Sequence, residues 1–141
     1  SLAITNQSTY EITFDRRENR YVLSHSGSDS ALDELPDSPF RNPDDPPEQH
    51  VVDFDELPSA GRGVRFVEAA TSDTPTDTIE YGPLGETTSG GYTLIWLAAG
   101  TGDGTKYVWL QVYPVTGLAE VGGYTTYGPP SMTRPSVAPA I

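Results

Sequence analysis

The chain has 141 residues, the usual length of one domain, and it contains no cysteine. Disulfide bonds, cysteine-based zinc sites and cysteine nucleophiles are therefore excluded. The formal net charge of −12, from 20 acidic and 8 basic residues, gives a surface that repels nucleic acids and anionic lipids. The 14 glycines and 13 prolines indicate many turns and few long helices.

The N-terminal part predicts a short helical end followed by a β-hairpin. Residues 1–7 contain the apolar Leu2 and Ile4 and are too few to form a helix alone, so we interpret them as the last turn of a longer helix. Apolar and polar residues alternate across residues 9–15, which is typical of a strand with one buried face. After a polar turn, residues 20–24 predict the returning antiparallel strand.

An acidic, proline-rich stretch follows at residues 29–56. It carries ten acidic residues against one arginine, so nine of the twelve net negative charges lie in these 28 residues. Five prolines interrupt the same stretch, and proline cannot continue a central strand. The pattern predicts a long surface loop, placed at about residues 25–60, with a short strand beginning at residues 50–52.

The second half of the chain predicts an antiparallel sheet. Short alternating segments at residues 64–68 and 78–81 are separated by a polar turn. Residues 92–99 and 106–113 predict a central hairpin that is covered on both faces, because apolar side chains occupy both sides of its second strand. A turn and a last short strand follow in residues 115–121.

These elements predict an all-β fold, an antiparallel β-sandwich of about seven or eight short strands with the stub of an N-terminal helix. The sandwich is expected to occupy residues 8–128. Residues 129–141 contain four prolines and predict an extended or mobile tail.

The residue types of a nucleophilic triad occur together near the end of the second predicted strand. His25 stands between Ser24 and Ser26, and Asp29 is close in sequence. A glycine-framed turn that would expose a nucleophilic serine is missing, so a polar turn is the favoured interpretation.

Other kinds of chemistry have plainer explanations in this sequence. Glu80 and Glu120 could form a carboxylate pair for glycoside hydrolysis, but such pairs arise easily among 20 acidic residues. Residues 53–56 and 102–104 place oxygen ligands suited to Ca²⁺ on turns, although a solvated acidic loop is favoured. We therefore predict no catalytic, cofactor-binding or metal-binding residues.

The two tryptophans, Trp96 and Trp109, lie inside the predicted central strands. Exposed, they would form a stacking platform for a sugar. Aromatic residues in alternating strands more often pack in a core or pair across strands, so a core role is favoured.

Several short motifs recur together in one protein family. The first group is the helix end at residues 3–7, followed by Phe-Asp, a short loop, Asn and Tyr within residues 10–15 and 19–22. The second group is residues 79–85, a Gly-containing turn, the strands at residues 92–99 and 106–113, and residues 114–117. In order and spacing they resemble the globular domain of the GspH/FimT-like pseudopilins of bacterial type II secretion, over about residues 1–24 and 78–122. Leu118 stands where the family commonly has a basic residue, and residues 29–56 form an oversized acidic insertion.

This resemblance implies a hydrophobic N-terminal helix ahead of Ser1, preceded by a prepilin-type leader, that anchors the protein in the inner membrane and packs in the pseudopilus. The chain would be the periplasmic head and would perform no covalent chemistry. Its implied partners are other pseudopilins and, as a further candidate, exported substrate, with Leu2 and Ile4 of the helix stub as partner-binding residues. No cofactor and no nucleic acid are implied, and membrane contact would come only through the preceding helix.

Two other classes of function stay open. A carbohydrate-binding β-sandwich would use exposed Trp or Tyr side chains. An enzyme would need a pocket with converging polar groups, which a sequence does not show.

Overall fold

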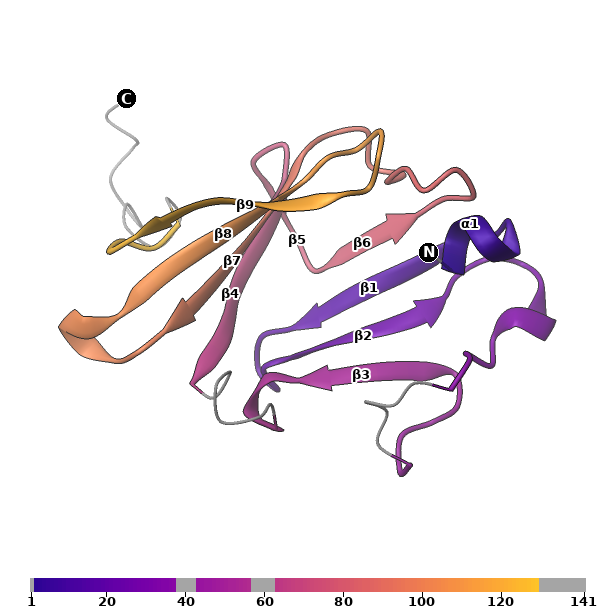
Figure 1. Ribbon diagram of the computed structural model, residues 1–141, viewed down its shortest axis with the longest axis horizontal. Coiled ribbons are helices and arrows are strands. Elements are labelled where there is room, and N and C mark those ends of the chain that lie inside the picture. Colours follow the sequence, from indigo (N-terminus) through magenta and orange to yellow (C-terminus); the bar gives the residue numbers. More distant parts are fainter. Residues whose placement is uncertain (1, 38–42, 57–62, 130–141) are drawn as a thin grey trace.

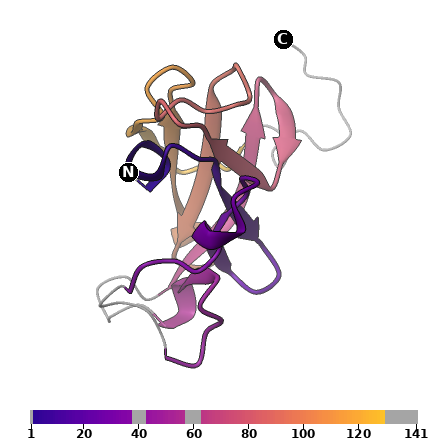
Figure 2. The same cartoon turned by 90° about the vertical axis from the view of Figure 1, so that its right-hand side faces the viewer.

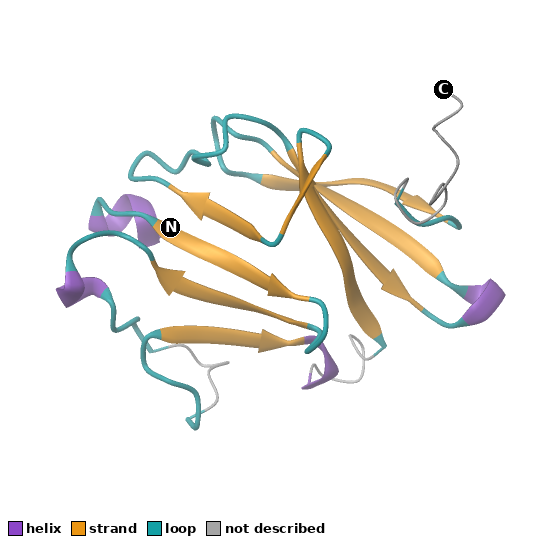
Figure 3. Ribbon diagram, turned by 180° about the vertical axis from the view of Figure 1, so that it is seen from behind, coloured by secondary structure: helices purple, strands orange, loops and turns teal. Residues whose placement is uncertain are grey.

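The computed structural model describes residues 2–37, 43–56 and 63–129, and these residues form two antiparallel β-sheets (Figure 1). The prediction of an all-β antiparallel sandwich with a short N-terminal helix is confirmed. Nine strands are present in the described residues, slightly more than expected. Helical segments there are confined to single short turns around the sheets (Figure 3). None of them has the length and hydropathy needed to cross a bilayer.

The first sheet, sheet A, has the strand order β3-β2-β1-β6. Its strands are β1 (Tyr10–Asp15), β2 (Arg20–His25), β3 (Gln49–Asp53) and β6 (Thr78–Tyr81). The expected β1–β2 hairpin is present, with Asp15 opposite Arg20 and Tyr10 opposite His25. This register places Tyr10 and Phe14 on the buried face, as the alternation of the sequence predicts.

The second sheet, sheet B, has the order β5-β4-β7-β8-β9. Its strands are β4 (Val64–Thr71), β5 (Thr74–Thr76), β7 (Thr93–Ala99), β8 (Lys106–Val112) and β9 (Ala119–Thr125). The predicted central hairpin is β7–β8, with Trp96 opposite Trp109. The polar turn expected before β6 contains β5, which folds back on β4 before the chain crosses to sheet A.

The acidic stretch is more structured than a loop. It contains the 3-10 turns η1 (Ser30–Leu32) and η2 (Phe54–Glu56), and the strand expected near residue 50 is β3. Leu35 and Phe54 are buried, at 5% and 9% exposed. Burying side chains of this size stabilises the fold by about 1.5–3 kcal/mol each. These two side chains fix the path of an otherwise mostly solvated stretch, whereas residues 38–42 and 57–60 of the predicted loop lie outside the described residues.

The main core lies between the sheets. The rings of Phe14 in sheet A and Phe66 in sheet B stack with centroids 4.8 Å apart and an angle of 6° between their planes. Other buried members of this cluster are Phe54, Ala69, Ile79, Ile95 and Val112. Figure 2, turned by 90° from Figure 1, shows α1 (Leu2–Asn6) beside the loops after β6 and β8.

A second apolar cluster covers the outer face of sheet B. It contains Val67, Trp96 and Ala98, with Trp109 partly buried against them. Trp96 is 7% exposed, which confirms its core role, and the two indole rings lie 5.2 Å apart. The outer face of the central hairpin is therefore apolar, as expected, but the cluster on it is formed by side chains of sheet B itself.

The last strand runs to Thr125, beyond its expected end. Pro129, the first residue of the predicted tail, is fully buried. The remainder of that tail, residues 130–141, lies outside the described residues.

Candidate functional site

The N-terminal helix is anchored to sheet A by its alanine. Ala3 is 2% exposed and packs in a cluster with Tyr10 and Leu35. Leu2 is partly buried against the same cluster. Of the two residues predicted to bind partners, Leu2 is therefore turned largely into the molecule, whereas Ile4 is 48% exposed.

Exposed apolar side chains gather beside this helix. They come from α1 and from the loops after β6 and β8, namely Ile4, Leu84, Val115 and Leu118, and we call this surface the apolar pole. Ile4 packs on Gly85, where a Cβ would lie 2.9 Å from Ile4 Cδ1. Gly117 packs on the carbonyl of Gly85, and the Thr87 amide donates to the Pro114 carbonyl at 2.7 Å. These contacts hold the two loops against each other and against the helix.

The two loop segments of the pole, residues 82–85 and 113–118, contain no charged residue. The phenol of Tyr81 lies beneath them beside Gly117, and burial raises its pKa above the usual value of 10.0. At the edge, the Tyr113 hydroxyl donates to the Glu120 carboxylate. This bond raises the pKa of Tyr113. The pole is therefore a largely apolar surface on a strongly acidic protein, with the carboxylates of Glu86, which lies against Gly82, and Glu120 at its edges.

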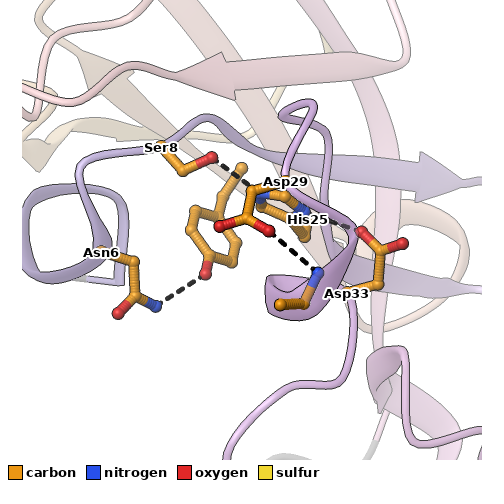
Figure 4. A network of polar contacts seen from close by, with 7 residues as sticks. Asn6, Ser8, His25, Asp29 and Asp33 are labelled. Carbon is orange, nitrogen blue, oxygen red and sulfur yellow. Dashed lines mark hydrogen bonds and ion pairs between the residues drawn. The ribbon is translucent and has the colours of Figure 1, made fainter.

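Next to the helix lies a network of polar side chains (Figure 4). Ser8 Oγ and His25 Nε2 are 2.6 Å apart, and His25 Nδ1 lies 2.8 Å from Asp33 Oδ1. The three residues come from the α1–β1 junction, the end of β2 and the segment after η1. Both imidazole nitrogens therefore have a partner, in the order found in nucleophilic triads.

His25 is held firmly in place. Its side chain is 0% exposed, whereas that of Asp33 is 49% exposed. The Tyr10 ring meets the imidazole edge-on with centroids 5.0 Å apart, and Asn6 Nδ2 donates to the Tyr10 hydroxyl at 2.8 Å. These contacts hold the imidazole with its Nε2 toward Ser8.

The sequence pattern singled out the histidine of this network, His25, but it placed Ser24, Ser26 and Asp29 beside it instead of Ser8 and Asp33. Ser24 alternates with His25 along β2 and so faces the other side of sheet A. Asp29 instead caps η1, accepting from the Ala31 amide at 3.0 Å. A signal for Ser8 existed, since the hairpin register that puts Tyr10 opposite His25 extends to put Ser8 opposite Gly27. No local signal pointed to Asp33.

At the other end of the β1–β2 hairpin, Asn19 connects the two sheets. Its Nδ2 donates to the Val64 carbonyl and to Asp55 Oδ1, each at 3.0 Å, and its Oδ1 accepts from the Phe66 amide at 2.7 Å. Asn19 also borders an open cavity of about 510 Å³ whose lining includes Arg16. With both ends of its amide bonded, Asn19 has a structural role there.

The remaining candidates of the sequence stay apart. Glu80 lies in sheet A opposite Glu11, and Glu120 lies in sheet B. Asp53 accepts from the Asp55 amide at 2.9 Å. Across residues 2–37, 43–56 and 63–129, no three His, Asp or Glu side chains are grouped so that they could hold a metal ion. The structure therefore keeps Glu80 and Glu120 apart, and none of the predicted calcium ligands is grouped into a site in these residues.

Comparison with known proteins yields no relative. The chain matches no protein-family model, and no curated protein or solved structure shows significant similarity to it.

Proposed function

We propose that this chain is the head of a minor pseudopilin of a type II secretion system or a related filament of the type IV pilus kind. It is a structural subunit rather than an enzyme. It is held at the periplasmic face of the inner membrane by a preceding N-terminal helix, and it contacts neighbouring pseudopilins laterally. The motifs that resemble the GspH/FimT-like family support this proposal, together with one structural observation, the apolar pole beside α1.

The pole favours assembly for a physical reason. Leu84 and Val115 are 82% and 81% exposed, although each side chain would gain about 1.5–3 kcal/mol from burial. A group of exposed apolar side chains on neighbouring loops commonly marks a contact with another protein. Because Ile4 of α1 belongs to the same surface, a neighbour seated on the pole would touch both the head and its helix.

The acidic stretch adds selectivity. Leu35 packs against Ala3 of α1, so the acidic stretch passes next to the helix whose Ile4 belongs to the pole. Charges at the rim of an interface set which partner docks and how fast, and they contribute less to affinity than the apolar centre. Partners with a basic rim around an apolar centre fit this arrangement.

Cysteine cross-linking in the native cells tests the proposal. The chain has no cysteine, so Leu84→Cys or Val115→Cys gives one thiol in the head. With a short bifunctional thiol reagent, and single cysteines placed across the candidate neighbours, both variants should give adducts with another pseudopilin. The matched control is Asp103→Cys, which is also exposed but lies in the β7–β8 turn, at the other end of β8 from Val115.

Cross-linking would refute the proposal in two ways, by the absence of adducts at both pole positions or by equal adducts at Asp103. The proposal would also be refuted by a coding sequence that lacks an apolar segment of about 20 residues ahead of Ser1, the length that a membrane-spanning helix requires.

A further inference from the structure

We propose that Ser8 is an activated nucleophile and a site of covalent acylation, taking the acyl group of an ester or thioester. The proposal is independent of the filament role. It concerns a modification of the chain itself, at the junction between the helix and the head. It rests on the geometry of Ser8, His25 and Asp33.

The hydrogen bonds of this network fix the direction of proton transfer. The Asp33 carboxylate accepts from Nδ1–H, so it holds the neutral imidazole in the tautomer whose Nε2 carries a free lone pair. That lone pair faces Ser8 Oγ at 2.6 Å and accepts the hydroxyl proton. His25 is therefore positioned as the general base for Ser8.

A backbone amide is available beside the nucleophile. The Thr9 N–H makes no hydrogen bond within the described residues, whereas the Thr9 carbonyl accepts from two amides, those of Ser26 and Gly27. In hydrolases with a nucleophilic serine, the amide of the following residue stabilises the oxyanion. Thr9 occupies that position relative to Ser8, so its N–H can stabilise the charge that develops on the acyl oxygen.

Glycine at position 27 makes the arrangement possible. A Cβ there would lie 2.1 Å from Ser8 Oγ, 2.8 Å from His25 Nε2 and 3.3 Å from the Thr9 nitrogen. The three groups therefore meet at one point, which any larger residue would occupy. Ser8 is half-buried and the His25 side chain is fully buried, so an acyl donor would have to approach from the side of Ser8.

The reaction balances without a further reagent. Ser8 Oγ attacks the carbonyl carbon of the donor while its proton passes to His25 Nε2. The tetrahedral intermediate collapses, the C–O or C–S bond to the leaving group breaks, and His25 returns the proton to the departing alcohol or thiol. The products are an ester on Ser8, a free alcohol or thiol, and neutral His25.

Labelling of the folded chain tests the proposal. A fluorophosphonate probe and, separately, p-nitrophenyl acetate are incubated with the protein, and peptide mass spectrometry locates the adduct. One equivalent should attach to Ser8. Ser8→Ala should abolish this adduct, and His25→Gln should slow its formation about 100-fold or more, the usual contribution of a general base.

Matched variants distinguish a loss of Ser8 reactivity from a loss of the folded structure. Ser24→Ala and Ser26→Ala, which remove the neighbouring hydroxyls, should leave the labelling of Ser8 unchanged. Asp33→Asn should slow labelling, and Asp33→Glu, which keeps a carboxylate, should restore part of the rate. The wild-type protein should lose its reactivity when unfolded in urea, a result that needs no variant to fold. Absence of a Ser8 adduct in the folded wild type, or equal labelling in urea, would overturn the proposal.

Discussion

The two ends of the β1–β2 hairpin carry polar networks of opposite character. At the turn end, Asn19 exchanges hydrogen bonds with backbone groups of β4, the Val64 carbonyl and the Phe66 amide, and with one carboxylate. At the open end, Ser8, His25 and Asp33 bond to one another through side chains alone.

The network at the turn end has a structural role, because it fixes β4 against the hairpin, whereas the network at the open end has the groups needed for a reaction. An amide side chain bonded to backbone has no titratable proton, so it can only fix the position of one strand relative to another. A hydroxyl beside an imidazole can give its proton to that imidazole, which the carboxylate holds in the correct tautomer and orientation. We therefore expect changes at the turn end to alter stability most, and changes at the open end to alter reactivity most.

The largest effect on stability is expected from Asn19→Ala. The substitution leaves the amide of buried Phe66 without its acceptor, and it places alanine at a φ of 53°, in the left-handed region that asparagine tolerates better. We expect a loss of about 2–4 kcal/mol in the free energy of unfolding, measured by urea denaturation.

Asn19→Gly is the control for the backbone contribution. Glycine adopts the left-handed conformation freely, so this variant should recover about 1 kcal/mol relative to alanine while still lacking the side-chain bonds. If both variants were as stable as the wild type, Asn19 would not fix β4 against the hairpin.

A smaller effect on stability is expected at the open end from Asp33→Asn. The amide oxygen of the introduced asparagine can still accept from His25 Nδ1, and the carboxylate that it replaces is 49% exposed. Interactions with such half-exposed charges contribute little, so the loss should stay below about 1 kcal/mol in the same urea measurement. A loss as large as that of Asn19→Ala would show that the open end also has a structural role, and would remove the contrast.

The hairpin and both sheets could be predicted from the sequence because their signals are local. Alternation in β1 and the apolar segments of β7 and β8 report burial of one or both faces, and burial decides strand formation. The path of the acidic stretch could not be predicted in the same way, because it depends on contacts that are distant in sequence. Its charge density indicates a solvated loop, but Leu35 and Phe54 determine where it packs, and two residues hardly change a composition.

The open-end network could be predicted only in part. His25 was a candidate, and the hairpin register could have placed Ser8 near it. Asp33 reaches His25 through the path of the chain after β2, which depends on the anchoring of Leu35 against α1. Contacts of this kind arise from tertiary packing, so no spacing rule in the sequence would have chosen Asp33 over Asp29.

The smallest effect is expected from raising the pH, because one partly buried tyrosine lies near each end of the β1–β2 hairpin. Tyr21 packs against Phe14 near the turn, and Tyr81 pairs with Tyr10 near the open end. Burial raises the pKa of both phenols above 10.0, so the folded state favours their neutral forms. This contribution to stability is complete below pH 10 and is lost as the pH rises through the raised folded pKa of each phenol. Urea denaturation at increasing pH above 10 should show a falling free energy of unfolding. Tyr21→Phe should remove the part of this fall that comes from the turn end, and Tyr81→Phe the part that comes from the open end. A fall unchanged in both variants would show that neither phenol reports on its end of the hairpin.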